Sequence, residues 1–182
     1  MALFDSIGAA LRFAMGFSVN QFARVAQYGV TPIGSGRGLV GLDGAAQAGM
    51  IWQMVDALPS LQRAALVARF GPKSAPCPCE SCIGGVVLDD RYKSAVTLLA
   101  KEAQREYPSA DVRMVQYVVR RHFEGGMTFA DIAARFDADA EDVRNVSRKV
   151  CPVLLAYEAR AQAAISDRMQ DGEIVECAEL AA

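Results

Sequence analysis

The sequence lacks any run of roughly 18 consecutive apolar residues, so no segment of it predicts a membrane-spanning helix. Its first stretch is apolar but contains Asp5 and Arg12, and it has neither a positively charged start nor a clear cleavage site. These features do not favour a signal peptide. The five cysteines are an odd number, which argues for a reducing compartment and against a disulfide framework. We therefore expect a cytoplasmic protein that does not bind membranes.

The sequence also has no excess of basic residues. It contains 19 Lys and Arg against 21 Asp and Glu, so its formal net charge is −2. The field of the whole chain cannot attract nucleic acid, so any such binding must come from a local patch or be assisted by a partner. Histidine occurs once, as His122, and the sequence shows no catalytic partner for it and no nucleotide-binding or metal-hydrolase motif. The sequence therefore predicts a protein that is not an enzyme.

The composition that is present is that of an ordinary globular protein, with 52% hydrophobic and 22% charged residues, which excludes wholesale disorder. A length of 182 residues suits one domain with a sizeable core or two small domains. Apolar residues recur mainly at helical spacing, and the short β-branched runs lie inside those helical patterns. The predicted fold class is therefore all-α, a helical bundle without strands.

Breaks in the helical pattern divide the chain into three parts. Residues 1–44 hold a helix over 3–28 and a glycine-rich linker over 29–44, a helical domain covers 45–170, and 171–182 form a flexible tail. Within the domain the pattern predicts further helices and one polar, cysteine-rich insertion at 72–86. The helices are expected over 45–70 (two of them), 89–106, 111 to about 123, and 152–170.

Residues 113–150 have the pattern of a helix-turn-helix. The preceding helix ends near Phe123, a Gly-Gly pair makes the turn, and Thr128 is placed to cap a short helix with Asp131 as its capping-box acid. Ile132 and Ala133 of that short helix are expected to face inward, together with Phe136. Asp139 then caps the next helix.

The second helix of this unit separates into an apolar and a polar side. Val143, Val146 and Val150 fall at core spacing. Their spacing leaves a polar face for solvent or DNA, on which Arg can pair with guanine and Asn with adenine once the helix enters a major groove. The predicted DNA-binding residues are Thr128, Arg144, Asn145, Arg148 and Lys149. The alternative is an unrelated helical bundle with the same caps and apolar spacing.

The segment resembles region four of bacterial sigma factors, where a Glu-Gly pair, a hydroxyl-capped helix with Ile-Ala and a reading helix follow one another. The matching residues are Phe123, Glu124, Gly125, Thr128, Ile132, Ala133, Val143 and Arg144. The stretch GMTFADIAARF also resembles phage antitermination proteins of the Q family, in which a cysteine-rich zinc insertion can accompany such a unit. The resemblance implies control of late-gene transcription, with binding to double-stranded DNA near a promoter and action on RNA polymerase.

Three cysteines, Cys77, Cys79 and Cys82, lie together in CPCESCIGG, and the second half of this stretch is typical of a zinc knuckle. Structural zinc takes four ligands, so a fourth must come from elsewhere in the chain, and His122 and Cys151 are the candidates. We expect a structural zinc ion, with a reduced, metal-free loop as the alternative.

The Cys151-Pro152 pair is expected to end the reading helix, because proline inside a helix removes a hydrogen bond. Pro152 would then begin a last helix that packs on the domain, forms a homodimer or contacts polymerase. The function predicted from the whole sequence is a DNA-binding transcription regulator, with a phage Q-type antiterminator as its most specific form. The alternative is a sigma-like, polymerase-binding protein that does not read DNA sequence by itself.

Overall fold

The computed structural model describes residues 4–25, 41–77, 79, 85–172 and 174. Within these residues the chain is almost entirely helical, and the predicted all-α class is confirmed apart from one short hairpin. The elements are α1 (Ile7–Val25), α2 (Gly41–Asp56), α3 (Ser60–Phe70), β1 (Ser74–Pro76), β2 (Val86–Leu88), α4 (Asp90–Ala103), the 3-10 helix η1 (Gln104–Glu106), α5 (Val112–Glu124), α6 (Phe129–Phe136) and α7 (Ala140–Asp171).

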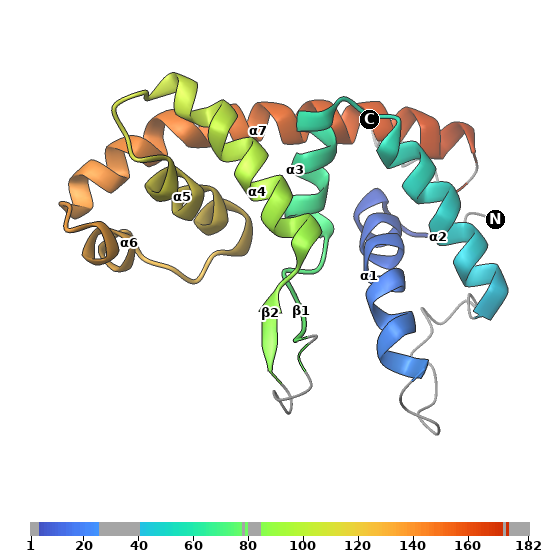
Figure 1. The fold of residues 1–182 in the computed structure, drawn as a ribbon. Coiled ribbons are helices and arrows are strands. Elements are labelled where there is room, and N and C mark those ends of the chain that lie inside the picture. The colour runs from blue at the N-terminus through green and yellow to red at the C-terminus, as the bar shows by residue number, and fades with distance from the viewer. Residues whose placement is uncertain (1–3, 26–40, 78, 80–84, 173, 175–182) are drawn as a thin grey trace.

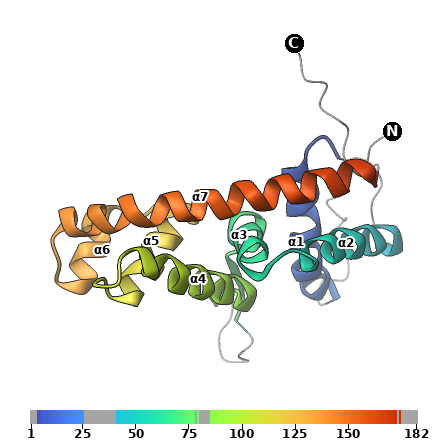
Figure 2. The ribbon, with the colours of Figure 1, turned by 90° about the horizontal axis from the view of Figure 1, so that it is seen from above.

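The longest helix, α7, runs along the whole body and organises the other helices (Figures 1 and 2). Its 32 residues span about 48 Å at the usual helical rise. Helices α5 and α6 pack on its first half, α3 and α4 lie beside its middle, and α1 and α2 lie at its far end. A buried stripe repeats along its length: Val143, Val146, Val150, Leu154, Ala161, Ile165 and Met169.

The prediction that a helix ends at Cys151-Pro152 is wrong, since α7 continues through Pro152. Proline cannot donate to the carbonyl of Arg148, but its exposed position lets water reach that part of the helix surface. Val150 and Leu154 on either side are fully buried and anchor both halves of the helix in one core. Packing therefore outweighs the local helix-breaking tendency of proline.

One hydrophobic core receives side chains from all seven α-helices of the described part of the chain. In α1, Leu11 and Met15 are almost fully buried, and the indole nitrogen of Trp52 in α2 donates to the carbonyl of Ala14 at 3.0 Å. The N-terminal helix is thus packed on the body. The predicted linker over 29–44 is too long at its end, because α2 already begins at Gly41, and residues 26–40 lie outside the described residues.

One residue of the predicted flexible tail is packed on the fold. Ile174 is buried, and its carbonyl accepts a hydrogen bond from the backbone amide of Phe4 at 3.1 Å. Ile174 is a single apolar residue in an acidic segment, and its sequence pattern does not predict burial. Its contact with Phe4 joins the two ends of the described chain. Residues 175–182 lie outside the described residues.

The expectation of no strand is also wrong, because β1 and β2 form an antiparallel hairpin. Ser74 pairs with Leu88 and Pro76 with Val86, and the amide of Cys77 donates to the carbonyl of Gly85 at 2.8 Å. Each strand has three residues and β2 is exposed, so the periodicity that marks a half-buried strand is missing. The hairpin projects from the helical body on the side away from α7 (Figures 1 and 2).

Candidate nucleic-acid interface

The segment from α5 to α7 is shaped by caps at each helix end. Gly125 and Gly126 adopt positive φ angles of 69° and 79°, which other residues rarely adopt, and they turn the chain between α5 and α6. The predicted capping box is confirmed: Thr128 Oγ1 accepts from the amide of Asp131 at 3.1 Å, and Asp131 Oδ2 accepts from the amide of Thr128 at 2.8 Å. Asp139 caps α7, as predicted, by accepting from the amide of Glu141 at 2.9 Å.

The apolar side of this unit is buried as the spacing predicts. Ile132 and Ala133 of α6 are buried, as are all three valines of the stripe on α7. Phe136 is half-buried and meets the ring of Tyr117 in α5 edge to face, with 5.6 Å between the ring centroids. The start of α7 is therefore held by α5 and α6, and the opposite side of its first turns faces solvent.

Four predicted DNA-binding residues lie together on that solvent side of α7. Arg144, Arg148 and Lys149 are exposed and Asn145 is half-buried. Arg148 Nη1 donates to Asn145 Oδ1 at 2.8 Å and lies 3.2 Å from Glu141 Oε1, while the other oxygen of Glu141 pairs with Arg144. One carboxylate therefore holds both arginines.

The remaining predicted residue, Thr128, lies at the N-terminal end of α6. It is exposed at the start of α6, where its hydroxyl oxygen already accepts the capping hydrogen bond. Phe129, the next residue, connects this point to α7, because the guanidinium carbon of Arg144 lies 5.5 Å from the centroid of the Phe129 ring.

The sequence reasoning missed Arg121, in the last turn of α5. Its guanidinium carbon lies 3.9 Å from the same Phe129 ring centroid, and its Nε is buried without a hydrogen-bond partner. A basic residue in the last turn of a helix ordinarily suggests only a favourable interaction with the helix dipole. The one sequence signal for its position was its spacing of four residues from Tyr117, which places both side chains on the side of α5 that meets α6.

The structure describes two of the three predicted zinc ligands, Cys77 and Cys79. The sulfurs of Cys77 and Cys79 lie 2.9 Å apart at the end of the hairpin, and Cys82 lies outside the described residues. Both candidates for the fourth ligand are elsewhere: His122 packs against α7, and Cys151 lies on α7 with its sulfur 3.3 Å from Ser147 Oγ. Among the described residues, no group of three or more His, Cys, Asp or Glu side chains is placed to hold a metal ion.

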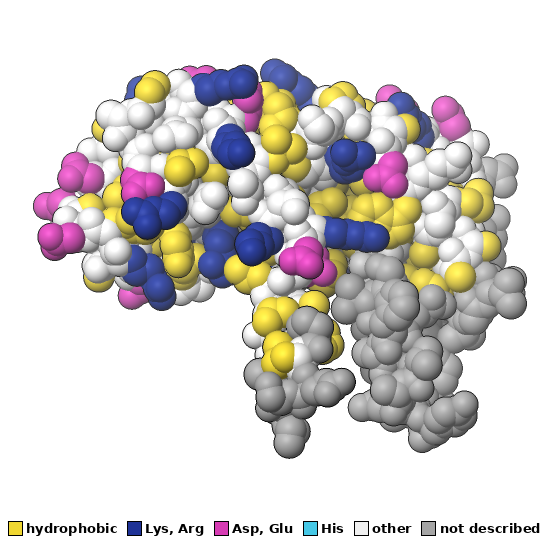
Figure 3. All heavy atoms as spheres, viewed as in Figure 1, with side chains coloured by type: hydrophobic (Ala, Val, Ile, Leu, Met, Phe, Trp, Pro, Cys, Tyr) yellow, Lys and Arg dark blue, Asp and Glu magenta, His cyan; other side chains and the backbone are white. Residues whose placement is uncertain are grey.

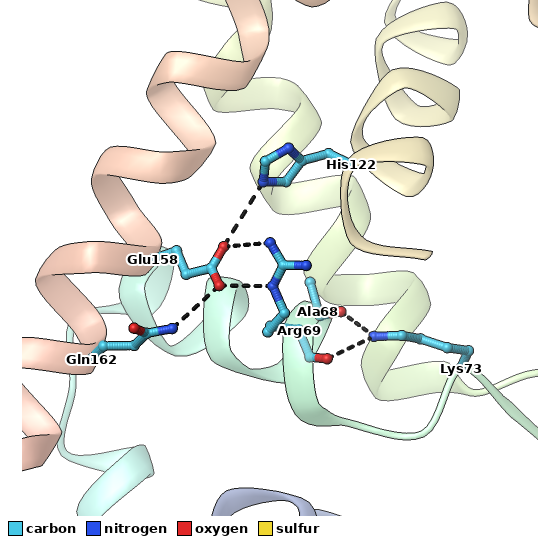
Figure 4. Close-up of polar contacts among 6 residues, drawn as sticks. All are labelled: Ala68, Arg69, Lys73, His122, Glu158 and Gln162. Atoms are coloured by element: carbon cyan, nitrogen blue, oxygen red, sulfur yellow. Dashed lines mark hydrogen bonds and ion pairs between the residues drawn. The ribbon is translucent and has the colours of Figure 1, made fainter. Parts of the chain in front are cut away.

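A second cluster of polar side chains is buried between α3, α5 and α7 (Figure 4). Arg69 donates to both carboxylate oxygens of Glu158, at 2.7 and 2.8 Å, and Gln162 donates to Oε1 at 3.3 Å. Nε2 of His122 lies 3.8 Å from Glu158 Oε2. Glu158 is only 8% exposed, so this ion pair fastens α3 to the middle of α7.

The charges around this cluster favour a neutral histidine. Burial and the neighbouring Arg69 lower the pKa of His122 below its usual 6.5, and Glu158 offsets only part of this. Close by, burial lowers the pKa of Lys73 to about 8, and its ammonium donates to the carbonyls of Ala68 and Arg69 at the end of α3 (Figure 4). The cluster thus joins three helices and closes the C-terminus of α3.

Basic and acidic side chains are interspersed over the face seen in Figure 3, without a large area of one sign. No described helix combines the length and apolar character that crossing a membrane requires.

Comparison with protein-family models, curated proteins and solved structures finds no match to this chain.

Proposed function

We propose that this protein is a DNA-binding transcription regulator that places the first turns of α7 in a major groove. The observation that carries the proposal is the division of this helix into two sides. The valine stripe is buried, and Arg144, Asn145, Arg148 and Lys149 occupy the opposite side at the outer end of the molecule. Arginine and asparagine on an exposed helix that follows a capped, tightly turned helix suit direct contact with base edges.

The resemblance to sigma region four and to Q-type antiterminators supports a specific setting for this activity. In that setting the chain binds near a promoter and acts on RNA polymerase. The formal net charge of −2 and the mixed surface of Figure 3 mean that long-range attraction to DNA is small. A polymerase partner would supply the missing affinity.

A second candidate is a polymerase-binding protein that does not read DNA sequence by itself. Glu141 favours it, because its carboxylate neutralises both Arg144 and Arg148. Asp139 and Asp142 add exposed negative charge to the same end of α7. These acids stabilise the helix dipole but repel phosphates.

Selection from a random double-stranded DNA library with the full chain distinguishes the two functions. We expect one enriched sequence, and Asn145→Ala or Arg148→Ala should weaken binding to it by about 1–3 kcal/mol and relax the preference at one base position. Arg160→Ala is the matched control, an exposed arginine in the second half of the same helix. Failure of the parent chain to enrich any sequence, together with capture of RNA polymerase, would establish the second candidate instead.

We also propose a structural zinc ion held by Cys77, Cys79 and Cys82. The hairpin supports it, because the Cys77–Gly85 hydrogen bond closes the loop that contains the other two cysteines. The close approach of the Cys77 and Cys79 sulfurs places two thiols at one point. His122 and Cys151 already contact Glu158 and Ser147, so we propose that the fourth ligand is another group.

Metal analysis of the purified chain tests this site. We expect close to one zinc per chain, and Cys77→Ser or Cys79→Ser should release it and lower the melting temperature, because structural zinc contributes folding free energy directly. Cys151→Ser, which changes a thiol on α7, should keep the metal. A chain that is purified without zinc and whose melting temperature does not respond to added zinc would contradict the proposal.

A further inference from the structure

We propose that Arg121 and Arg144, gathered around the ring of Phe129, form a binding site for a backbone phosphate of nucleic acid. The inference rests on the proposed function and adds to it. It assigns a role to Arg121 of α5, the helix that precedes α6, and it moves Arg144 from base reading to backbone contact.

The geometry brings two cations from separate helices to one aromatic ring. The guanidinium carbons of Arg121 and Arg144 lie 3.9 and 5.5 Å from the Phe129 centroid, both within the range of about 6 Å for cation–π attraction. Phe129 is the first residue of α6, so the ring that gathers the arginines is fixed by the capping box at that helix end. Two long side chains are thereby ordered before any ligand arrives.

Arg121 differs from a typical partly buried arginine in its surroundings. Among the described residues no carboxylate lies within ion-pair distance of it, in contrast to Arg120 next to it, which pairs with Glu124 at 3.0 Å. Its Nε is buried without a hydrogen-bond partner, while the residue as a whole is half-buried. A half-buried guanidinium without a carboxylate partner suits a phosphate oxygen, which binds guanidinium strongly.

The surroundings of Arg144 point to the same ligand. Its partner Glu141 is exposed, with about half of the side chain accessible, so an incoming phosphate can replace that carboxylate at small cost. Arg144 lies over the Phe129 ring of α6, while Asn145, the next residue, is hydrogen-bonded to Arg148. A phosphate held by the first pair would set the register in which the second pair meets base edges.

The salt dependence of binding tests the site without knowledge of the target. The probe is a random-sequence DNA duplex, bound by the full chain at several KCl concentrations. Each phosphate contact contributes about 0.9 to the slope of log K against log salt, so Arg121→Gln should reduce the slope by about 0.9 and weaken binding. Arg121→Lys keeps the charge and should keep most of the slope. Arg160→Gln is the matched control, because Arg160 also lies over an aromatic ring, Tyr157, at 5.9 Å, but in the other half of α7.

The outcomes separate this inference from the function on which it rests. Binding by the parent with the same slope in Arg121→Gln overturns the phosphate site alone. No binding of the duplex by the parent overturns the proposed function and the phosphate site with it. A folded Arg144→Gln chain, checked by circular dichroism, should show a further loss of slope, and an unchanged slope there would confine the contact to Arg121 and overturn the paired site.

Discussion

Replacing Glu158 with Ala should lower the free energy of unfolding by about 3 kcal/mol, because it leaves a partly buried guanidinium without its carboxylate. Glu158 and Arg69 share two short hydrogen bonds, and the carboxylate side chain is only 11% exposed. Removal also leaves His122 and Arg69 facing each other without the negative charge between them. Urea denaturation followed by circular dichroism measures the change.

Two further variants show whether the loss comes from an unpaired charge. Asp167→Ala changes an exposed acid on the same helix and should stay within about 0.5 kcal/mol of the parent. The double variant Arg69→Met and Glu158→Leu removes both charges and should recover most of the stability, because apolar replacement of a buried pair is often neutral. Equal losses in Glu158→Ala and in the double variant would show that the ion pair itself, rather than an orphaned charge, is needed.

Replacing Pro152 with Ala should raise the free energy of unfolding by about 1–3 kcal/mol, the second large effect. Alanine supplies the amide that the carbonyl of Arg148 lacks, and proline in a helix interior costs about 3 kcal/mol relative to alanine. Pro152 is exposed, so its loss creates no cavity in the core. Thermal and urea unfolding of the full chain provide the measurement.

The matching control places a proline where the structure has none. Ala159 is exposed on α7 about two turns after Pro152, and Ala159→Pro should destabilise the chain by an amount similar to the proline penalty. If Pro152→Ala is no more stable than the parent, the packing of α7 requires a bend at this position, and the two halves of the helix are then aligned by the proline itself.

Local signals in the sequence predicted the segment from the end of α5 to the first turns of α7 well. Thr128, Asp131 and Asp139 occupy cap positions that depend only on residues within three places along the chain. The valines of α7 follow helical spacing that any stable packing must bury. These features needed no knowledge of distant contacts, and for that reason both the caps and the buried stripe could be placed before the structure was known.

Contacts between residues far apart in the sequence could not be predicted from sequence patterns. Arg69 and Glu158 are 89 positions apart, and each taken alone is an ordinary charged residue of an amphipathic helix. Arg121 could be recognised only once α6 carried Phe129 against the end of α5. The hairpin is too short for an alternating pattern, and the continuity of α7 through Pro152 is decided by the core on either side.

The unbroken length of α7 connects the two ends of the molecule through one continuous helix. The side chains proposed to meet DNA lie near one end, and the other end packs against α1 and α2. A tilt of about 5° over a rod of about 48 Å displaces the far end by about 4 Å, which is close to the spacing of successive base pairs. A partner that binds the α1–α2 end and tilts α7 would therefore move the turns proposed to meet DNA by about one base-pair spacing.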